Sequence, residues 1–516
     1  MSDNMIRVNA QLRKVPSPDE WENATEISLM DNQFSTLPNN PNCPNLVSLF
    51  LQRNPNLRVI PSSFFDSMLN LTNLDLSKTR IRTLPKSLFK LKRLQVLVIR
   101  DCEHLMTLPS EIGLLTTLEV LDLQGTELLN LPDTVTELSK LKSLKVSFFG
   151  PRNQSKRNNL PRKLMKDGLI SSFPLLEELG LFLHPDDRRW IVSASDITRE
   201  VTRLMLLSAI YFRFPELENL DYFLQGSRAW KNDVVKNFNF IVGTDIKRVV
   251  PLVTRDVELL HISSERCLRF VNGETIPRGV VEVLKRANSF YLEHHIGMCY
   301  LSKFGIDNMD ELRLCILSDC PKARAIIHHA DDRQVILPSL EYLSLNSLWN
   351  LKSIVVGSVC EGSFGALRCL TVRTCRKLSF VFTCSMVRNL VNLEELVIMD
   401  CESLKYIVIQ DDMINGYGDI TAVNVGEFVV LPCLKVVKLH YLPNLVGIGI
   451  NAWPNVEYMS FYNCPKLKKV DMTADDAVNV KEIAAEKAWW ESVEWSEPAL
   501  PERLDRVFTQ IQHGDF

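Results

Sequence analysis

The stretch Leu94-Gln95-Val96-Leu97-Val98-Ile99-Arg100-Asp101-Cys102 contains the pattern that decides the fold of this chain. Its first, fourth and sixth residues are aliphatic, and a side chain suited to a turn stands at the ninth. The same spacing recurs upstream and downstream, where the second aliphatic residue falls at 49, 74, 97, 121 and 144, at intervals of 25, 23, 24 and 23. A weaker copy lies 22 residues before Leu49. A regular period of this length indicates one array of short stacked units.

Each copy has a direct structural interpretation. The aliphatic-x-aliphatic segment predicts a short strand, because alternate side chains of a strand point to opposite faces. The Asn or Cys that follows can meet open backbone groups where the chain bends. Leu-Pro pairs such as Leu84-Pro85 follow later in several copies. They suit the return arm, the convex segment that leads from one strand to the next, because Pro resists strand pairing. The pattern and period are those of leucine-rich repeats. We therefore predict an α/β solenoid, a leucine-rich repeat horseshoe with a parallel β-sheet on the concave face and short helices, 3-10 turns and loops on the convex face.

The period divides the chain into five segments. It loosens after Gly150 and returns near residue 311, with Cys at the turn position of several copies. Between these runs, three groups keep the spacing: Val235/Phe238/Phe240, Val257/Leu260/Ile262 and Ala287/Phe290/Leu292. The expected segments are 1–23 (an N-terminal cap or the remnant of a preceding domain), 24–150 (regular repeats), 151–310 (a basic insertion and degenerate repeats), 311–470 (Cys-type repeats with an insertion at 410–426) and 471–516 (a C-terminal helical cap and tail).

The last segment changes character. Ile483, Ala484, Trp490 and Val493 fall near the spacing of one helix face, so we predict a helix over 480–495. The last coil of a solenoid has an open face that must be covered. The simplest role for this Trp-rich helix is therefore a cap, with partner binding as the alternative and a frayed tail beyond Pro498.

Composition excludes several classes of protein. The 516 residues carry 59 Lys and Arg against 62 Asp and Glu, which gives a net charge of −3. Nucleic-acid-binding proteins usually carry an excess of positive charge, which this chain does not have. No apolar run is long enough to span a membrane. The 13 cysteines include no Cys-x-x-Cys pair, and no export signal stands at the start of the sequence. Reduced thiols in the cytoplasm or the nucleus are therefore expected.

Motifs for catalysis and cofactor binding are also absent from the sequence. None of the 20 glycines is followed by Lys, which excludes a standard P-loop, and neither His-Glu-x-x-His nor Gly-x-Ser-x-Gly occurs. The adjacent pairs His294-His295 and His328-His329 would face opposite ways on a strand and could not share one ion. We predict no enzyme activity, no catalytic or metal-binding residue, no cofactor and no small-molecule substrate.

The outward positions of the predicted strands are the best candidates for binding, because the solenoid holds them in a fixed array. Aromatic and cationic side chains are favoured at protein-binding hot spots. The alternative is an ordinary mixed polar sheet face. A second candidate is the basic insertion (Arg152, Lys156, Arg157, Arg162, Lys163 and Lys166), which could dock an acidic surface or simply be solvated. The candidate residues of the concave face are Arg368, Arg373, Lys435, Lys438, His440, Tyr441, Tyr458 and Tyr462.

Three stretches of the sequence are distinctive: Trp21-Glu22-Asn23-Ala24-Thr25-Glu26-Ile27-Ser28-Leu29-Met30-Asp31-Asn32, Leu74-Asp75-Leu76-Ser77-Lys78-Thr79 and Glu486-Lys487-Ala488-Trp489-Trp490-Glu491-Ser492-Val493-Glu494-Trp495. They resemble the leucine-rich repeat region of plant coiled-coil NLR (NB-ARC-LRR type) disease resistance proteins. The resemblance implies that the repeats detect a pathogen effector or a guarded host protein and hold the nucleotide-binding module inactive. This sequence lacks the coiled coil and that module, so nucleotide binding and cell-death signalling do not carry over.

Two non-enzymatic functions fit the sequence. The first is a plant immune recognition module that is cytoplasmic or nuclear, works through protein partners and binds no nucleic acid. Those partners are an effector or guarded host protein, or the nucleotide-binding module of a receptor. The alternative is an intracellular repeat adaptor such as a ubiquitin-ligase substrate receptor. That adaptor would need a helical F-box-like stretch before the repeats, and only a short segment precedes Ile27.

Overall fold

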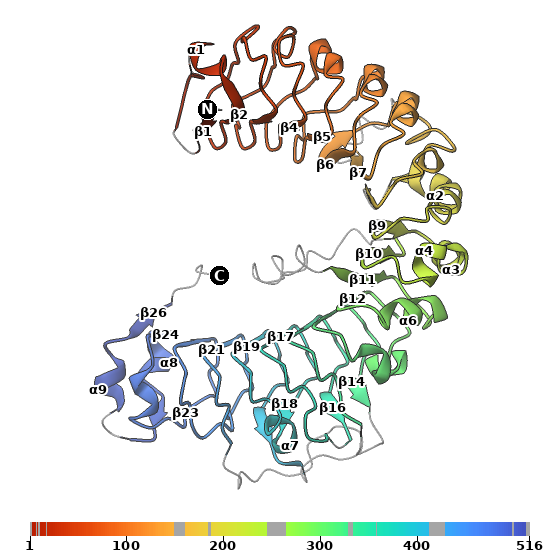
Figure 1. The fold of residues 1–516 in the computed structure, drawn as a ribbon. Coiled ribbons are helices and arrows are strands. Elements are labelled where there is room, and N and C mark those ends of the chain that lie inside the picture. Colours follow the sequence, from red (N-terminus) through yellow and green to blue (C-terminus); the bar gives the residue numbers. More distant parts are fainter. Residues whose placement is uncertain are drawn as a thin grey trace. The chain divides into compact units, whose positions relative to one another are not determined.

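The computed structural model divides into two compact units, 1–245 and 246–516, and each is described by itself. Figure 1 shows the strands and helices of both units. The structure describes residues 3–6, 8, 11–16, 18–148, 160–183, 187–244, 265–328, 334–357, 359–411, 429–497 and 500–511.

Unit 1 is built on ten parallel strands that follow one another in sequence order within its described residues. Leu74 pairs with Leu97, and Leu97 with Leu121, so equivalent leucines of successive coils face one core. This register confirms the predicted solenoid. The strands are β1 (Asp3–Ile6), β2 (Ala24–Ser28), β3 (Ser48–Phe50), β4 (Asn73–Asp75), β5 (Val96–Val98), β6 (Val120–Leu128), β7 (Ser143–Phe148), β8 (Glu178–Phe182), β9 (Ala209–Phe214) and β10 (Asn237–Val242).

Short helices form the other side of the unit 1 coils (Figure 1). Three 3-10 helices start directly after Pro85, Pro109 and Pro132, where the fixed φ of proline favours the first turn and no N–H is lost. The helices are α1 (Pro18–Trp21), η1 (Lys86–Lys90), η2 (Ser110–Leu114), η3 (Asp133–Glu137), η5 (Ile170–Ser172), α2 (Arg188–Val201), α3 (Leu217–Gly226) and α4 (Arg228–Lys231).

The later coils of unit 1 replace leucines with aromatic side chains. Phe214 and Phe240 lie 5.2 Å apart between ring centroids, and Trp230 lies 5.6 Å from Phe240. These larger rings fill the space under the longer helices α2 and α3. Phe238 and Phe240, which the spacing placed in a degenerate coil, lie buried in β10. The group Val257/Leu260/Ile262 lies outside the described residues.

Unit 2 repeats the same plan with ten further parallel strands in its described part. They are β11 (Arg266–Val271), β12 (Ser289–Glu293), β13 (Leu314–Ser318), β15 (Tyr342–Asn346), β17 (Cys369–Arg373), β19 (Glu395–Met399), β21 (Val436–His440), β22 (Tyr458–Tyr462), β24 (Glu482–Ala485) and β26 (Phe508–Gln510). The helices are α6 (Arg278–Leu284), η6 (Leu301–Phe304), η7 (Ile306–Met309), α7 (Cys384–Val387), η9 (Asp476–Val478), α8 (Lys487–Trp490) and α9 (Leu500–Leu504).

Additional short strands on the return arm of unit 2 were not expected from the sequence. They form three two-stranded parallel sheets. Ile326, Ile327, Ile354 and Val408 occupy these strands, and β-branched side chains favour extended backbone over helix. The pairs are β14 (Ala325–His328) with β16 (Ser353–Val356), β18 (Phe380–Thr383) with β20 (Tyr406–Ile409), and β23 (Lys469–Val470) with β25 (Glu494–Trp495).

The turn after each main strand has a repeated construction. Asn54 Nδ2 donates to the Leu29 carbonyl at 2.9 Å, and Cys464 Sγ donates to the Leu439 carbonyl at 3.2 Å, in each case on the preceding coil. The residue before the turn residue adopts a left-handed backbone, with φ of 60° at Arg53 and 75° at Gly125. All 13 cysteines are free thiols, and burial raises the pKa of Cys464 to about 12. The cysteines of the turn therefore serve as buried weak donors.

The predicted helix over 480–495 is wrong. Ile483 lies in β24 and pairs with Met459, 24 residues upstream, while only the single turn α8 is helical. This segment forms a strand because Val480, Ile483 and Ala485 fit the repeat frame. As a strand it also pairs with the backbone groups of the previous coil, which would otherwise lack partners. The tail beyond Pro498 is also ordered where described, since α9 buries Leu500 and Leu504.

Candidate functional site

The side chains that point away from the core of unit 2 form rows across its main strands. One row runs through Tyr342, Cys369, Glu395, Val436, Tyr458 and Glu482, and the next through Ser344, Thr371, Val397, Lys438, Ser460 and Ala484. Neighbouring strands lie about 4.8 Å apart, so the rows hold side chains at fixed spacings. We call this surface the strand face.

At one end of the strand face, the outward side chains are already packed together. Cys267, Tyr291, Leu314 and Ile316 form a buried apolar cluster, with Tyr342 against it. The four buried side chains offer no exposed surface for a partner, and Tyr342 is partly covered. The two rows are most open over β21 to β24, because Cys369, Thr371 and Val397 on β17 and β19 are also buried.

A hollow of about 350 Å³ opens on the strand face over β21, β22 and β24. Its lining comprises Val436, Val437, Lys438, Tyr458, Met459, Ser460, Glu482 and Ala484. Lys438, Ser460 and Ala484 occupy one row, so two small side chains stand beside a lysine. Tyr458 is 42% exposed, and Lys481 Nζ lies 5.7 Å from its ring centroid. We call this site the strand-face hollow.

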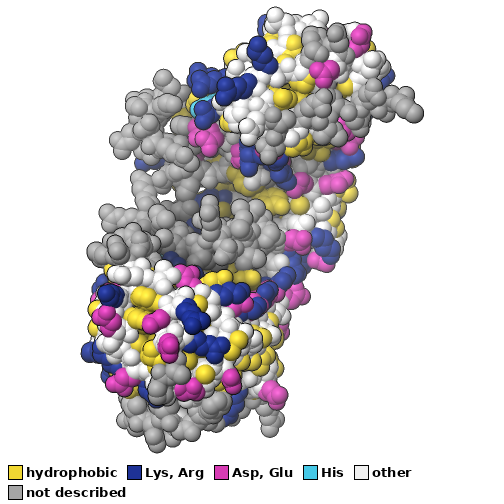
Figure 2. Space-filling model, turned by 90° about the vertical axis from the view of Figure 1, so that its left-hand side faces the viewer, with side chains coloured by type: hydrophobic (Ala, Val, Ile, Leu, Met, Phe, Trp, Pro, Cys, Tyr) yellow, Lys and Arg dark blue, Asp and Glu magenta, His cyan; other side chains and the backbone are white. Residues whose placement is uncertain are grey.

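Three of the predicted cations pair with carboxylates on neighbouring coils. Arg368 Nη2 lies 2.8 Å from Glu394 Oε1, and Lys435 Nζ lies 3.0 Å from Glu394 Oε2. Both cations hold the pKa of Glu394 below its usual value, and the carboxylate raises the pKa of Arg368. Lys438 Nζ lies 3.6 Å from Glu395 Oε1. These charges are therefore partly neutralised. Figure 2 shows both signs of charge beside apolar side chains on another face of the molecule.

The structure places two other predicted residues in the packed interior. His440 is 2% exposed, and its Nε2 lies 2.7 Å from Ser460 Oγ. Burial, with the nearby positive charges of Lys438 and Arg373, lowers the pKa of His440 to about 4, so the ring is neutral at pH 7. Tyr462 is also buried. Neither side chain can present a charged or exposed contact.

Arg373 and Tyr441 lie partly exposed at the end of the strands. Burial lowers the pKa of Arg373 from its ordinary value. Tyr441 packs edge-to-face on Tyr462 with ring centroids 5.1 Å apart. Its φ is +54°, whereas equivalent coils place Asp400 and Asn463 at this left-handed position. A bulky side chain there carries backbone strain, because its Cβ approaches the following carbonyl.

Ser460, Glu482 and Ala484 were missed as site residues. The helix predicted over 480–495 removed Glu482 and Ala484 from the sheet, although the 24-residue step from Met459 to Ile483 carried the correct signal. Of the basic insertion, Arg162, Lys163 and Lys166 are exposed, and its earlier residues lie outside the described part.

Other candidate chemistry finds no support in the described residues. No group of three or more His, Cys, Asp or Glu side chains there could hold a metal ion. His294 Nδ1 lies 2.7 Å from Asp319 Oδ2, while His295 is buried with its Nε2 2.9 Å from the Thr275 carbonyl. His329 lies outside the described residues. None of the described helices has the length and apolar character to cross a bilayer.

Comparison with known proteins agrees with this fold. Residues 339–474 match the family described as plant disease resistance protein RPS2-like, leucine-rich repeats, and residues 44–105 match the leucine rich repeat family. These matches make the chain similar, over residues 339–474, to the leucine-rich repeats of plant disease resistance proteins. Disease resistance protein At4g27190 of Arabidopsis thaliana is 26% identical over 517 residues, covering 94% of this chain and 47% of that protein. Disease resistance protein RFL1 of the same plant is 30% identical over 188 residues, covering 34% of this chain and 19% of that protein.

The leucine-rich repeat chain thus spans about half the length of the first of these relatives. The resemblance seen in the sequence is confirmed. Among solved structures, the functional domain of InlJ from Listeria monocytogenes matches with a TM-score of 0.43 and 15% identity, covering 80% of this chain and 78% of that chain.

Proposed function

We propose that this leucine-rich repeat chain is a non-enzymatic recognition module that binds a pathogen effector or a guarded host protein through its strand face. The observation that carries the proposal is the strand-face hollow, where an exposed tyrosine stands beside small side chains on a sheet of fixed geometry. Tyrosine is among the side chains that dominate binding energy at protein interfaces. A rigid sheet presents it at little cost in conformational entropy.

The hollow also defines what a partner must offer. Its volume of about 350 Å³ accepts one or two side chains rather than a whole secondary-structure element. Lys438 and Glu482 border it with opposite charges, so a partner with one apolar anchor flanked by polar groups fits best. The ion pairs of Arg368 and Lys435 with Glu394 act as a structural frame around this contact.

A second role for the same face is intramolecular. In a full receptor, the strand face would hold the nucleotide-binding module in its inactive state, and an effector would compete for that surface. The expected compartment is the cytoplasm or the nucleus.

The test compares two tyrosines of similar exposure. Pathogen effectors and guarded host proteins are screened for binding to the full chain, and Tyr458→Ala is measured against Tyr222→Ala, which removes a 49% exposed ring from α3. A hot-spot loss of about 2 kcal/mol corresponds to roughly 30-fold weaker binding for Tyr458→Ala. Ala484→Trp, which fills the hollow, should weaken binding similarly. Equal affinities for the native chain, Tyr458→Ala and Ala484→Trp would refute the role of the hollow.

A further inference from the structure

A second hollow lies on the flank of unit 2, away from the strand face, where the chain runs from each turn to the return arm. The residues two and four positions beyond the turn residue recur in register on this flank. After Cys320 they are Lys322 and Arg324, and after Leu348 they are Asn350 and Lys352. Lys352 N donates to the Arg324 carbonyl at 2.8 Å, so these two cations stand on adjacent coils.

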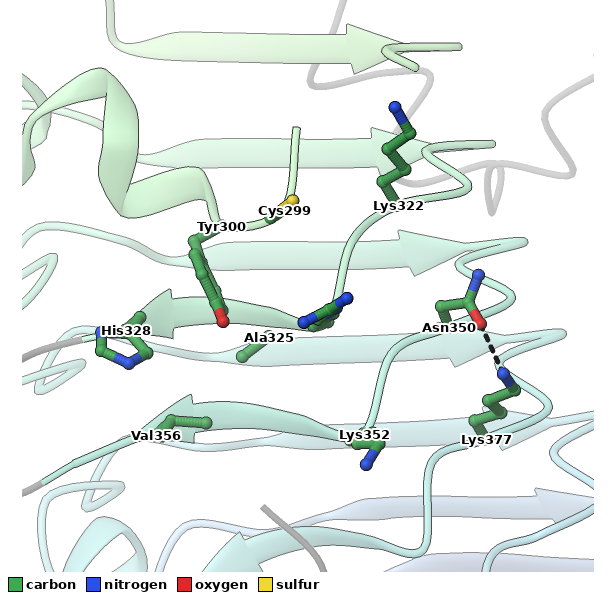
Figure 3. A pocket seen from close by; sticks show the side chains of 10 residues that line it. Cys299, Tyr300, Lys322, Ala325, His328, Asn350, Lys352, Val356 and Lys377 are labelled. Carbon is green, nitrogen blue, oxygen red and sulfur yellow. Dashed lines mark hydrogen bonds between the residues drawn. The ribbon is translucent and has the colours of Figure 1, made fainter. Parts of the chain in front are cut away.

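The hollow has a volume of about 570 Å³. We call it the basic pocket; it is lined by Cys299, Tyr300, Lys322, Arg324, Ala325, His328, Asn350, Lys352, Val356 and Lys377. Figure 3 shows Lys322, Lys352 and Lys377 toward one end, and Tyr300 and His328 at the other. The Tyr300 and His328 ring centroids lie 4.8 Å apart. One end is therefore cationic and the other aromatic.

The charge of the basic pocket differs from that of the strand face. Among its described lining residues, four are cationic and none is a carboxylate. On the strand face, by contrast, Arg313 and Arg368 each lie within 2.8 Å of a glutamate on the next coil. In the part of the chain that the structure describes, neither Lys322 nor Arg324 has a carboxylate within ion-pair distance. Like charges that face one hollow repel each other, and an anion bound there would remove the repulsion.

One of these cations is held in position by a neutral partner. Lys377 Nζ donates to Asn350 Oδ1 at 2.6 Å, and Asn350 Nδ2 donates to the Pro321 carbonyl at 2.6 Å (Figure 3). This chain of two hydrogen bonds orients the ammonium group without neutralising it. A fixed cation loses less conformational entropy when it meets an anion.

We propose that the basic pocket binds a small anion that carries at least two phosphate groups. Arg324 can meet one phosphate with two parallel N–H groups, and the lysines can meet another as point charges. A volume of about 570 Å³ exceeds the needs of a single phosphate and lies within the range of small-ligand sites. Tyr300 and Val356 would flank the uncharged part of the ligand. This ligand is separate from the protein partner of the strand face.

The repeat itself supplies a matched control for the test. Lys466 and Lys468 stand two and four residues after Cys464, as Lys322 and Arg324 stand after Cys320, but they lie outside the basic pocket. Binding of inorganic tripolyphosphate to the full chain is measured by titration calorimetry at physiological salt. The double variant Lys322→Ser with Arg324→Ser should weaken binding by roughly tenfold or more, since each removes a charge-assisted contact. Lys466→Ser with Lys468→Ser should leave the affinity within about twofold.

Competition then identifies the source of the phosphate groups. Displacement of tripolyphosphate by a nucleoside triphosphate would assign a soluble ligand, and displacement by vesicles with a phosphorylated lipid headgroup would assign a membrane lipid; both support the proposal. Three results would overturn it: no binding by the native chain, equal loss in the two double variants, or equal displacement by sulfate at the same ionic strength. All substituted side chains are exposed, and thermal unfolding checks that each variant folds.

Discussion

Removal of the Glu200 carboxylate should open the start of η5. Glu200 lies near the end of α2 and is 8% exposed. It accepts hydrogen bonds from the backbone N–H groups of Gly168 at 2.6 Å, Ile170 at 2.8 Å and Ser171 at 3.2 Å. A buried carboxylate thus satisfies three donors at the first turn of a helix, where no intrahelical partner exists.

The magnitude follows from these contacts. Hydrogen bonds to a charged group contribute about 1.5–3 kcal/mol each, and they are not additive, so Glu200→Ala should lower the local stability by about 3–5 kcal/mol. Gln keeps one carbonyl oxygen and can still accept from Ile170 and Ser171, which share Oε2. Glu200→Gln should therefore cost about 1–2 kcal/mol, through the lost Gly168 contact.

Amide hydrogen exchange across 165–175 measures this effect locally, which avoids assuming two-state unfolding of a long repeat array. A loss of about 3 kcal/mol raises the exchange rates of these amides by roughly 150-fold. The control is Glu137→Ala in η3, an exposed glutamate at the end of a similar helix. Exchange in Glu200→Ala that stays within about threefold of the native rate, or that Glu137→Ala matches, would refute the reasoning.

Three further predictions concern the last coils of unit 2. The pKa of His440 is lowered to about 4, so the folded state resists protonation of this ring. The contribution of the neutral ring to stability is complete above pH 6.5 and should fall by about 3 kcal/mol as the pH drops from 6.5 to 4. Thermal unfolding of His440→Asn should show a flatter pH dependence over that window, and parallel profiles for the variant and the native chain would contradict this. Tyr441→Asn should change the free energy of unfolding by less than about 1 kcal/mol, because relief of the strain in the left-handed backbone offsets loss of the contact with Tyr462. A loss of stability above about 2 kcal/mol in denaturant titration would show that the contact dominates. Trp489→Ala should cost about 3–5 kcal/mol, because this buried ring stacks on Phe461 at 4.5 Å. Unchanged amide exchange in β24 would contradict this contribution of Trp489.

The regular part of the fold was predictable from sequence because one period determines it. The spacing of Leu74, Leu97 and Leu121 predicted both the strand register and the shared core, and their pairing confirms it. The turn cysteines were likewise assigned a structural role from their place in the frame. Each of these inferences rests on contacts between equivalent residues of adjacent coils, which the period alone specifies.

Features that depend on unequal coils could not be read in this way. Glu394 pairs with Lys435, 41 residues later, because a long insertion still ends in a coil that stacks in register. Four apolar residues at helical spacing predicted a helix at Ile483, whereas hydrogen bonds to the neighbouring strand make this segment part of the sheet. The burial of His440 depends on Ser460 and Tyr462 in the next coil.

The turn hydrogen bonds tie each coil to both of its neighbours. The Asn54 amide and the Cys464 thiol both donate to a carbonyl of the coil that precedes them. The backbone of the turn donates the other way, since Asp31 N bonds to the Gln52 carbonyl and Arg53 N to the Ser77 carbonyl of the following coil. Deleting a coil from either side therefore leaves a turn donor without its acceptor. Shortened versions of this protein should therefore lose stability whichever end is trimmed, unless the new terminal coil is given a polar cap of its own.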